Sequence, residues 1–395
     1  MNILIISHFF PPHKGGVETA SYNTAKKLVK FGHNIVILTS KNEKTSPKYQ
    51  KMDGFLVYRF KSFYLPEIKG IPQISSFGIM PKAIFKLTKI IRKHQIQIIH
   101  AEGRLFPITF IATLLNKLVF KRPIYITVQG RLSIGLTGLI EFLFDIIITK
   151  FLYQKGDKII CVSNSLKKRL ISINIDQKKL IVIPNGVDVS VFNPYNSSTF
   201  LDKYIIKKKN AKKVIFVGRL DPQKGVEFLI RAIPYIIKEY NMVHFFILGN
   251  GNLEIKLKNL VKTLEIQSFV SFLNMIPLEK MPEFYASADI FCLPSLHEGF
   301  PLSISEALSM GLVIVASATE GIPEAIIENK NGFLVEPGNV HSLVDKLLKS
   351  LRLNDKKIKE IRERNINLAK SKYSWENIVK QIEDVYCERL GKSKL

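Results

Sequence analysis

The sequence predicts an α/β fold with two domains, each built around a parallel β-sheet, and three observations support this. The chain has 395 residues, of which 46% are hydrophobic, so it can bury more than one core. Short apolar runs alternate with helix-like patterns along the chain, as expected for strands joined by crossover helices. This alternation breaks near residues 193–211. We therefore expect domains over residues 1–195 and 196–372, and a final helix over residues 373–395 that packs back on the first domain.

Most of the predicted strands are continuous runs of Ile, Val and Leu, which are typical of parallel strands buried on both faces. In the first half the expected strands are Asn2–Ser7, Ile35–Leu38, Phe55–Phe60, Ile96–His100, Ile124–Val128, Lys158–Val162 and Leu180–Ile183. In the second half they are Val214–Val217, His244–Leu248, Val270–Phe272, Ile290–Leu293, Val313–Ala316 and Phe333–Val335. Helical patterns fall between most of them, so right-handed crossovers are expected.

Composition argues against several classes of protein. Cys161, Cys292 and Cys387 lie far apart and form no Cys-x-x-Cys motif, which argues against a zinc site or a disulfide framework and favours a reducing compartment. The apolar start, MNILIISHFF, lacks the basic segment of a signal peptide, so we interpret it as a first buried strand. The sequence contains no uncharged apolar run of about 18 residues, and no membrane-spanning helix is expected.

The net charge of +25 is unevenly distributed. Residues 1–200 carry 29 Lys and Arg against 10 Asp and Glu, which gives +19, whereas residues 201–395 carry 29 against 23, which gives +6. The excess in the first half indicates a face that meets an anionic partner such as a membrane, a nucleic acid or a phosphorylated substrate. Solvated lysines in a lysine-rich sequence are the alternative explanation.

A glycine pair follows the first predicted strand, in the loop HFFPPHKGGVE. Gly15 and Gly16 stand just before a helix that is expected to begin near Glu18. Paired glycines allow a ligand to approach the backbone closely, and a helix N-terminus attracts anions. The loop lacks the Gly-x-Gly-x-x-Gly fingerprint, and a simple tight turn is the alternative. His13 in the same loop is a candidate acceptor contact, although exposed loop histidines are common.

Two cationic residues follow the first strand of the second half, in the segment FVGRLDPQKGVEFLIRA. Arg219 and Lys224 come between this strand and a helix expected to start near Val226. The carboxyl ends of parallel strands are where open α/β sheets bind ligands. Because Arg can contact two phosphate oxygens at once and Lys supplies a mobile charge, we expect both to bind phosphate.

The most informative segment is ADIFCLPSLHEGFPLSISEALSMG. Pro301 suits the first turn of a helix, where its missing N–H would have no acceptor in any case. The N–H groups of Leu302 and Ser303 are then expected to face a bound phosphate. Glu298 lies in the loop beside them and Glu306 about one helical turn further in, and carboxylates of this kind accept hydrogen bonds from sugar or ribose hydroxyls.

Glu298 and Glu306 form a Glu-x7-Glu pair, and further motifs surround it in order: GGVE, IPNGVD, VGRLDPQKG, EGFPLSISEALSMG, NGFLVEPGN and SWENI. With this set the chain resembles, nearly end to end, the GT4-type family of retaining glycosyltransferases with the GT-B fold. The resemblance implies two Rossmann-like domains whose parallel sheets face each other across a cleft. It implies no particular sugar or acceptor.

The resemblance also implies roles for individual residues. Arg219 and Lys224 would hold the donor diphosphate, and with Glu298, beside the transferring sugar, they are the expected catalytic residues. Glu306 would bind the ribose hydroxyls. The whole donor site is expected to comprise Gly15, Gly16, Arg219, Lys224, Glu298, Gly299, Phe300, Leu302, Ser303 and Glu306.

The chain departs from the family at positions expected to face the sugar. Gln129 stands where many relatives have His, and an amide can donate a hydrogen bond but cannot carry positive charge. His100 matches a frequent histidine of the family, whereas Glu102 stands where a second His is common. Gln129, His100 and His13 are the candidate acceptor or sugar contacts.

A metal-independent reaction is expected, because the sequence shows no Asp-x-Asp metal motif and Arg219 and Lys224 can neutralise the diphosphate. No cofactor is expected; the nucleotide-sugar is a co-substrate. The basic amphipathic segment 81–94 and the apolar segment 139–153 suggest an enzyme held peripherally on the cytoplasmic face of the cell membrane. Packing of both segments on the sheet is the alternative.

We therefore expect a hexosyltransferase that acts on a glycan or lipid-linked acceptor in the synthesis of polysaccharide, lipopolysaccharide or glycolipid, without a nucleic-acid partner. An epimerase or phosphorylase with the GT-B fold is an alternative within enzymes. A basic nucleic-acid-binding protein is the alternative from another class.

Overall fold

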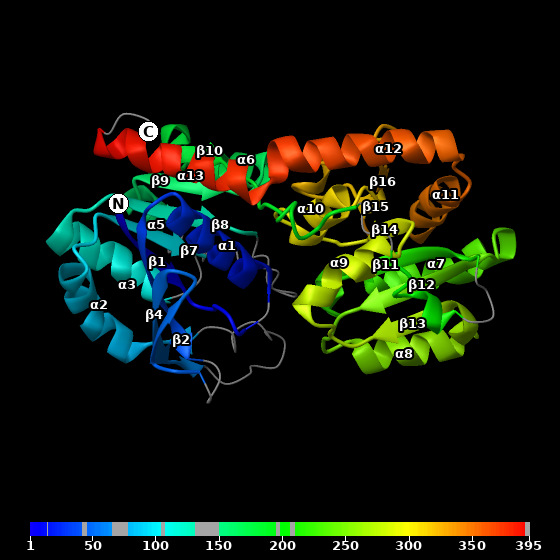
Figure 1. Cartoon of the computed structure of the whole chain (residues 1–395), viewed down its shortest axis with the longest axis horizontal. Coiled ribbons are helices and arrows are strands. Elements are labelled where there is room, and N and C mark those ends of the chain that lie inside the picture. Colours follow the sequence, from blue (N-terminus) through cyan, green and yellow to red (C-terminus); the bar gives the residue numbers. More distant parts are fainter. Residues whose placement is uncertain are drawn as a thin grey trace. The chain divides into compact units, whose positions relative to one another are not determined.

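A computed structural model shows that the chain folds into two α/β units (Figure 1). It describes residues 1–13, 15–41, 46–64, 78–103, 107–130, 150–194, 198–205 and 210–391. The first unit comprises Met1–Asn185 together with Trp375–Leu395, and the second comprises Gly186–Ser374. Within the described residues, no helix is both apolar enough and long enough to cross a membrane.

The first boundary lies earlier than the expected position at residue 195, because the chain beyond Asn185 already bonds to the second unit. The backbone N–H of Val187 donates to the carbonyl of Tyr373 at 2.8 Å, and the Ser309 hydroxyl donates to the carbonyl of Phe192 at 2.6 Å. The second boundary, at Ser374–Trp375, lies two residues beyond the expected one.

The first unit is built on an eight-stranded sheet with the strand order β10-β9-β8-β7-β1-β2-β4-β3. The strands are β1 (Asn2–Ser7), β2 (Asn34–Lys41), β3 (Tyr49–Met52), β4 (Phe55–Lys61), β7 (Ile98–Glu102), β8 (Ile124–Val128), β9 (Lys158–Cys161) and β10 (Leu180–Val182). The helices are α1 (Gly16–Lys30), α2 (Pro81–Lys93), α3 (Pro107–Leu115), α5 (Lys150–Lys155), α6 (Asn164–Ser172) and α13 (Trp375–Leu390), and a π-helical turn, η2 (Asn116–Phe120), extends α3. A separate ribbon pairs β5 (Phe63–Tyr64) with β6 (Gly78–Ile79).

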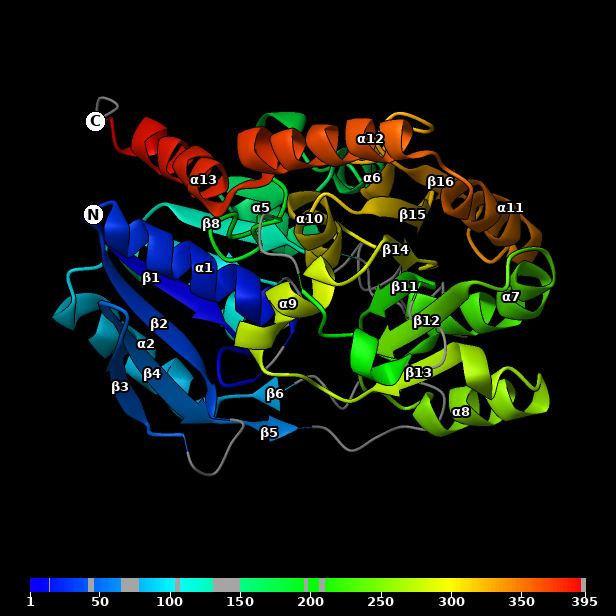
Figure 2. The ribbon, with the colours of Figure 1, turned by 45° about the vertical axis from the view of Figure 1, so that its right-hand side comes forward.

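The last helix, α13, lies alongside α1, at the opposite end of the sequence (Figures 1 and 2). Lys27 on α1 pairs with Glu376 on α13 at 3.0 Å. The ring of His33, just after α1, lies 2.7 Å from the carboxylate of Glu383. These contacts place the C-terminal helix in the first unit.

The second unit has a six-stranded, fully parallel sheet with the order β13-β12-β11-β14-β15-β16. Its strands are β11 (Lys212–Val217), β12 (Val243–Leu248), β13 (Val270–Leu273), β14 (Ile290–Leu293), β15 (Val313–Ser317) and β16 (Phe333–Val335). Its helices are α7 (Val226–Glu239), α8 (Glu254–Thr263), α9 (Met281–Ala286), α10 (Leu302–Ser309), α11 (Val340–Leu351) and α12 (Asp355–Leu368). β12 is buried along its whole length, as its VHFFIL sequence predicts.

Every strand expected from the sequence forms, with ends shifted by a few residues. Three strands were not expected: β3, which is a polar edge strand antiparallel to β4, and the two-residue strands β5 and β6. Two helix starts lie one or two residues from the expected positions. α1 begins at Gly16, two residues before Glu18, and α10 begins at Leu302, so that Pro301 is its cap residue and not part of its first turn. Of the expected helix over 139–153, residues 139–149 lie outside the described part of the chain.

Both sheets have a point where the strand order reverses. In the second sheet β11 lies between β12 and β14, and in the first sheet β1 lies between β2 and β7. The chain therefore leaves the neighbouring strands β11 and β14 in opposite directions along the sheet, and it does the same at β1 and β7. Ligands of open α/β sheets bind at such points.

Candidate functional site

In the second unit, the loops after β11 and β14 interlock. The backbone N–H of Leu296 donates to the carbonyl of Gln223 at 2.8 Å, and the Gln223 side chain donates to the carbonyl of His297 at 2.9 Å. Gly225 has a φ of +64°, and a Cβ there would lie 2.0 Å from the carbonyl oxygen of Pro294. Only glycine permits this approach, so the two loops are held side by side at the point where the strand order reverses.

This arrangement brings together Lys224 and Glu298, which were predicted from separate motifs. Their side chains form a salt bridge, and each is largely buried, with 14% and 7% of its surface exposed. The hydroxyl of Ser295 donates to the same carboxylate oxygen at 2.9 Å. A buried charge pair with an additional hydrogen bond holds both side chains in a defined orientation.

Arg219 lies at the edge of this cluster, with 69% of its side chain exposed. It pairs with Asp221 at 3.0 Å, and Asp221 also accepts a hydrogen bond from the backbone N–H of Lys224 at 3.2 Å. Because guanidinium has five N–H donors, Arg219 retains donors for phosphate oxygens. Asp221 was not predicted from the sequence, although an Asp-Pro pair is a recognised turn signal that could have indicated its role.

Gly299 and Phe300, which link Glu298 to α10, are buried. The ring of Phe300 is 3% exposed and stacks on Tyr373 with ring centres 5.0 Å apart. The side chain of Phe300 therefore anchors the loop in the core.

The start of α10 lies next to Glu298. Leu302 and Ser303 are its first two residues, and N–H groups at these positions have no acceptor inside a helix. With the positive end of the helix dipole they form an anion-binding group. The second unit thus combines Lys224, Arg219 and the start of α10 at one sheet edge.

Glu306 lies further along α10 and accepts a hydrogen bond from the hydroxyl of Tyr285 at 2.7 Å. Burial raises the pKa of Glu306 to about 7. The Tyr285 bond occupies one carboxylate oxygen and leaves the other for hydroxyl groups of a ligand. Tyr285 gave no signal in the sequence, because nothing in its segment marks it as a partner of a residue 21 positions away.

In the first unit, Gln129 links two other side chains at the carboxyl edge of the sheet. Its amide nitrogen donates to Glu102 at 3.2 Å, and its amide oxygen accepts from Asn185 at 3.0 Å. Glu102 is 3% exposed, and burial raises its pKa to about 7. These bonds fix which end of the Gln129 amide faces which neighbour.

The predicted sugar contact at His100 is wrong for this structure, because the residue is 0% exposed. Its Nδ1 lies 2.5 Å from the hydroxyl of Tyr386 and its Nε2 lies 2.6 Å from that of Thr127. Burial lowers the pKa of His100 to about 4, so it is neutral at physiological pH. Its role is to join α13 to the sheet.

The loop after β1 has its own carboxylate. Nδ1 of His13 lies 2.6 Å from Glu18, and its ring stacks on Phe9 with centres 4.6 Å apart. A Cβ on Gly15 would lie 2.2 Å from the same carboxylate, which would then have to move aside. The approach of a donor to Gly15 and Gly16 stays a prediction.

No group of three or more side chains that could hold a metal occurs in the part of the chain that the structure describes. The described cations and helix start can nevertheless balance the charge of an anion.

Comparisons with known proteins identify families and structures that the chain resembles. Residues 14–191 match the model "Glycosyltransferase Family 4", and residues 198–385 match "Glycosyl transferases group 1". The phosphatidylinositol N-acetylglucosaminyltransferase GPI3 subunit of Saccharomyces cerevisiae is 28% identical over 388 residues, which cover 98% of this chain and 82% of that protein.

Two solved structures share the fold. Sucrose-phosphate synthase from Thermosynechococcus elongatus superposes with a TM-score of 0.84 at 19% identity, over 99% of this chain and 100% of the other. Anabaena HepE in complex with UDP and glucose superposes with a TM-score of 0.79 at 20% identity, over 98% and 100% of the two chains.

Proposed function

This chain belongs to the GT4-type glycosyltransferases with the GT-B fold, and from that membership we propose that it is a retaining, metal-independent hexosyltransferase. Its donor is a nucleotide-sugar, and its acceptor is a lipid-linked sugar or glycan in the synthesis of a cell-surface polysaccharide, lipopolysaccharide or glycolipid. The observation that carries the proposal is the convergence of Lys224, Glu298 and the start of α10 at the edge of the second sheet.

The donor diphosphate is held by Lys224, Arg219 and the N–H groups of Leu302 and Ser303. Two positive side chains and one helix start are sufficient to balance a diphosphate without a metal. Glu306 accepts hydrogen bonds from the ribose through the carboxylate oxygen that does not bond Tyr285. HepE, which shares the fold, was solved with UDP and glucose, and this supports a nucleotide-sugar donor here.

In the reaction, the bond between the anomeric carbon and the diphosphate oxygen breaks, and the acceptor oxygen bonds to that carbon on the same face. The departing phosphate takes the acceptor proton. Negative charge grows on this phosphate in the transition state, where Lys224 and Arg219 stabilise it. Glu298 orients the sugar and is not a covalent nucleophile, because Lys224 and Ser295 already hold its carboxylate.

We propose that the enzyme reaches its acceptor while it is bound at a membrane surface. The yeast relative is named for transfer to phosphatidylinositol. On α2 the apolar residues Leu87, Ile90 and Ile91 are buried against the unit, while Phe85 is 82% exposed. The outward face of α2 also carries five exposed cations: Lys82, Lys86, Lys89, Arg92 and Lys93. An exposed aromatic ring among cations suits the headgroup region of an anionic leaflet, the inner face of the cell membrane.

The experiment that tests the donor site is a thermal-shift panel of UDP-, GDP- and ADP-sugars. One donor class is expected to raise the melting temperature of the wild type. Arg219→Ala and Lys224→Ala should remove most of that rise, whereas Arg231→Ala, which removes an exposed cation on α7, should keep it. A rise of the same size in both site variants would exclude this phosphate site.

A further inference from the structure

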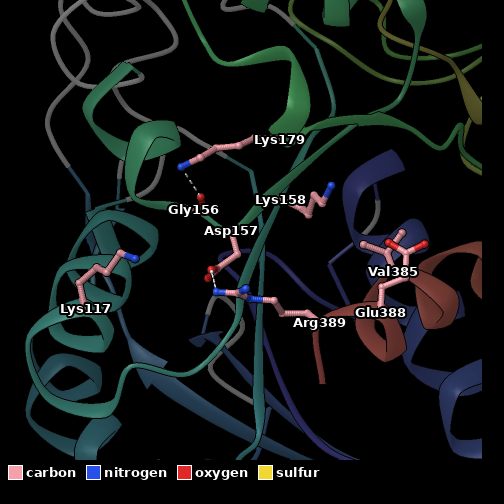
Figure 3. Close-up of a pocket in the computed structure, with 8 residues that line it drawn as sticks. All are labelled: Lys117, Gly156, Asp157, Lys158, Lys179, Val385, Glu388 and Arg389. Atoms are coloured by element: carbon pink, nitrogen blue, oxygen red, sulfur yellow. Dashed lines mark hydrogen bonds and ion pairs between the residues drawn. The ribbon is translucent and has the colours of Figure 1, made fainter. Parts of the chain in front are cut away.

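A pocket of about 400 Å³ lies in the first unit, away from the carboxyl edge of the sheet (Figure 3). It is formed where β9 begins, next to η2 and the end of α13. The residues that line it are Lys117, Gly156, Asp157, Lys158, Lys179, Val385, Glu388 and Arg389. None of these residues belongs to the site described above, and β8, β9 and β10 are parallel, so the pocket lies at their amino ends.

The pocket is positively charged. Four cationic side chains and two carboxylates line it, which leaves a net charge of +2. One carboxylate is already in use, because Asp157 accepts a hydrogen bond from the backbone N–H of Ile124 at 2.9 Å and pairs with Arg389 at 3.3 Å. Asp157 therefore organises the pocket and its charge is partly neutralised, so the remaining field attracts an anion.

Two of the lysines are held in place by backbone carbonyls. Lys179 donates to the carbonyls of Gln154 and Gly156 at 2.7 and 3.0 Å, and Lys158 donates to that of Lys178 at 2.9 Å. An ammonium group has three N–H donors, so each lysine keeps at least one for a ligand. Because these lysine side chains are already ordered, they would lose less conformational entropy when an anion binds.

The segment that follows Lys117, a residue of the pocket lining, exposes both apolar and cationic side chains. Leu118 and Val119, which follow Lys117 on η2, are 69% and 52% exposed. Lys121 and Arg122, which come next, are also exposed. Exposed apolar side chains with cations beside them suit the interface of an anionic bilayer.

We propose that this pocket binds the phosphate group of an anionic phospholipid, while Leu118 and Val119 enter the membrane interface beside it. The proposal rests on the peripheral membrane contact proposed for α2 and gives it a defined headgroup site. The two surfaces are connected within the first unit, because α3 packs against α2 and η2 extends α3.

The test measures flotation of the full chain with phosphatidylcholine vesicles that contain either phosphatidylglycerol or the same fraction of cholesteryl hemisuccinate, whose charge is a carboxylate. We expect the wild type to prefer phosphatidylglycerol. Lys158→Met should abolish that preference, and Lys117→Glu should weaken binding by about tenfold, since each cation near an anionic leaflet contributes about 1 kcal/mol. The matched control is Lys168→Glu, an exposed lysine on α6 outside the pocket.

Equal binding of the wild type to both kinds of vesicle would overturn the proposal, and so would an equal loss of vesicle binding in Lys117→Glu and Lys168→Glu. A third contrary outcome is a rise in melting temperature with inorganic phosphate that requires Lys158, together with vesicle binding that does not require Lys158. The last would identify a soluble phosphate ligand. The thermal shift with the sugar donor is measured on every variant. Its retention shows that the variant is folded, and its absence in the wild type would count against the donor site and not against this pocket.

Discussion

The salt bridge between Lys224 and Glu298 is the residue-level feature on which the donor site depends. Removing one member of a buried pair leaves an uncompensated charge and typically costs about 3–5 kcal/mol. Alanine variants at either position therefore mix loss of stability with loss of function. Substitutions that keep the shape of the side chain avoid a cavity but still remove the charge, so stability has to be measured beside activity.

Glu298→Gln is expected to lower stability, because the Lys224 ammonium loses its counter-charge. It should still keep the fold and the donor-induced thermal shift, because the amide oxygen accepts the hydrogen bond from Ser295. The turnover number should fall by about a hundredfold, since the charge beside the transferring sugar is lost. Steady-state kinetics with a fixed acceptor measure this. Glu283→Gln, an exposed position on α9, is the control. Unchanged turnover in Glu298→Gln would remove Glu298 from the mechanism.

Donor affinity is expected to depend on pH through Glu306. Its pKa is about 7, and only the carboxylate accepts two hydroxyl hydrogen bonds, so the competent fraction rises from about one-tenth to nine-tenths between about pH 6 and pH 8. Affinity measured by calorimetry should rise by about tenfold over this range. The contribution of Glu306 to the free energy of unfolding has the opposite pH dependence. It falls as the pH rises from about 4.5 to 7, because the folded chain holds the proton more tightly than the unfolded chain.

Glu306→Gln should bind donor more weakly and lose this pH dependence. Glu102→Gln should retain it, although Glu102 also has a pKa of about 7, because it lies in the other unit. A slope that persists in Glu306→Gln and disappears in Glu102→Gln would reverse the assignment.

At the scale of elements, α13 is the helix whose position depends most on a few polar contacts. Tyr386 reaches the buried ring of His100, and its ring lies 4.7 Å from that of Tyr125. Glu376 and Glu383 on the same helix add contacts to Lys27 and His33. Polar groups buried in this way stabilise the docked helix only while each has its partner.

Tyr386→Phe should therefore lower the free energy of unfolding by about 1–3 kcal/mol, because it removes the partner of a buried His100 nitrogen and adds no bulk. Urea denaturation monitors this, and the sugar donor should still raise the melting temperature. Tyr235→Phe, at a position that is 54% exposed, is the control. Equal stability of the two variants would mean that the His100 contact contributes nothing measurable.

The exposed face of α2 gives a second prediction for an element. Replacing Lys82, Lys86 and Lys89 by Glu should greatly reduce flotation with phosphatidylglycerol vesicles and leave activity on a soluble acceptor intact. The control places Glu at three exposed lysines of the second unit: Lys330, Lys356 and Lys359. If both triple variants bind vesicles equally, α2 has no specific part in membrane contact.

For the whole molecule, the sequence was sufficient to predict what depends on local pattern. Buried runs such as Ile290–Leu293 gave strands. Arg219, Lys224 and Glu298 were predicted as site residues because each follows a strand end and because the motifs around them resemble those of the family. Contacts between distant segments were not predictable. Tyr386 and His100 are 286 residues apart, and no periodicity links them. The polar strand β3 was missed because its order comes from pairing with β4 and not from its own composition.

The difference in net charge between the two parts of the chain is slightly larger when the chain is divided by its folded units than when it is divided at residue 200. Residues 1–185 and 375–395 carry 33 Lys and Arg against 13 Asp and Glu, which gives +20, whereas residues 186–374 carry 25 against 20, which gives +5. The vesicle binding proposed for the first unit would act over long distances and through exposed cations, so salt should screen it strongly. Binding of the donor depends on short contacts to partly buried groups in the second unit, so salt should screen it less.

Raising the salt concentration from about 0.05 to 0.5 M is therefore expected to lower vesicle binding by at least about tenfold and donor affinity by less than about threefold, because the Debye length shrinks from above 10 Å to a few ångströms. Flotation and calorimetry on the same preparation measure both. Potassium sulfate at equal ionic strength controls for effects of the anion. Equal sensitivity of the two interactions would show that the donor, too, is attracted mainly by the diffuse field, which would remove the distinction between the two units.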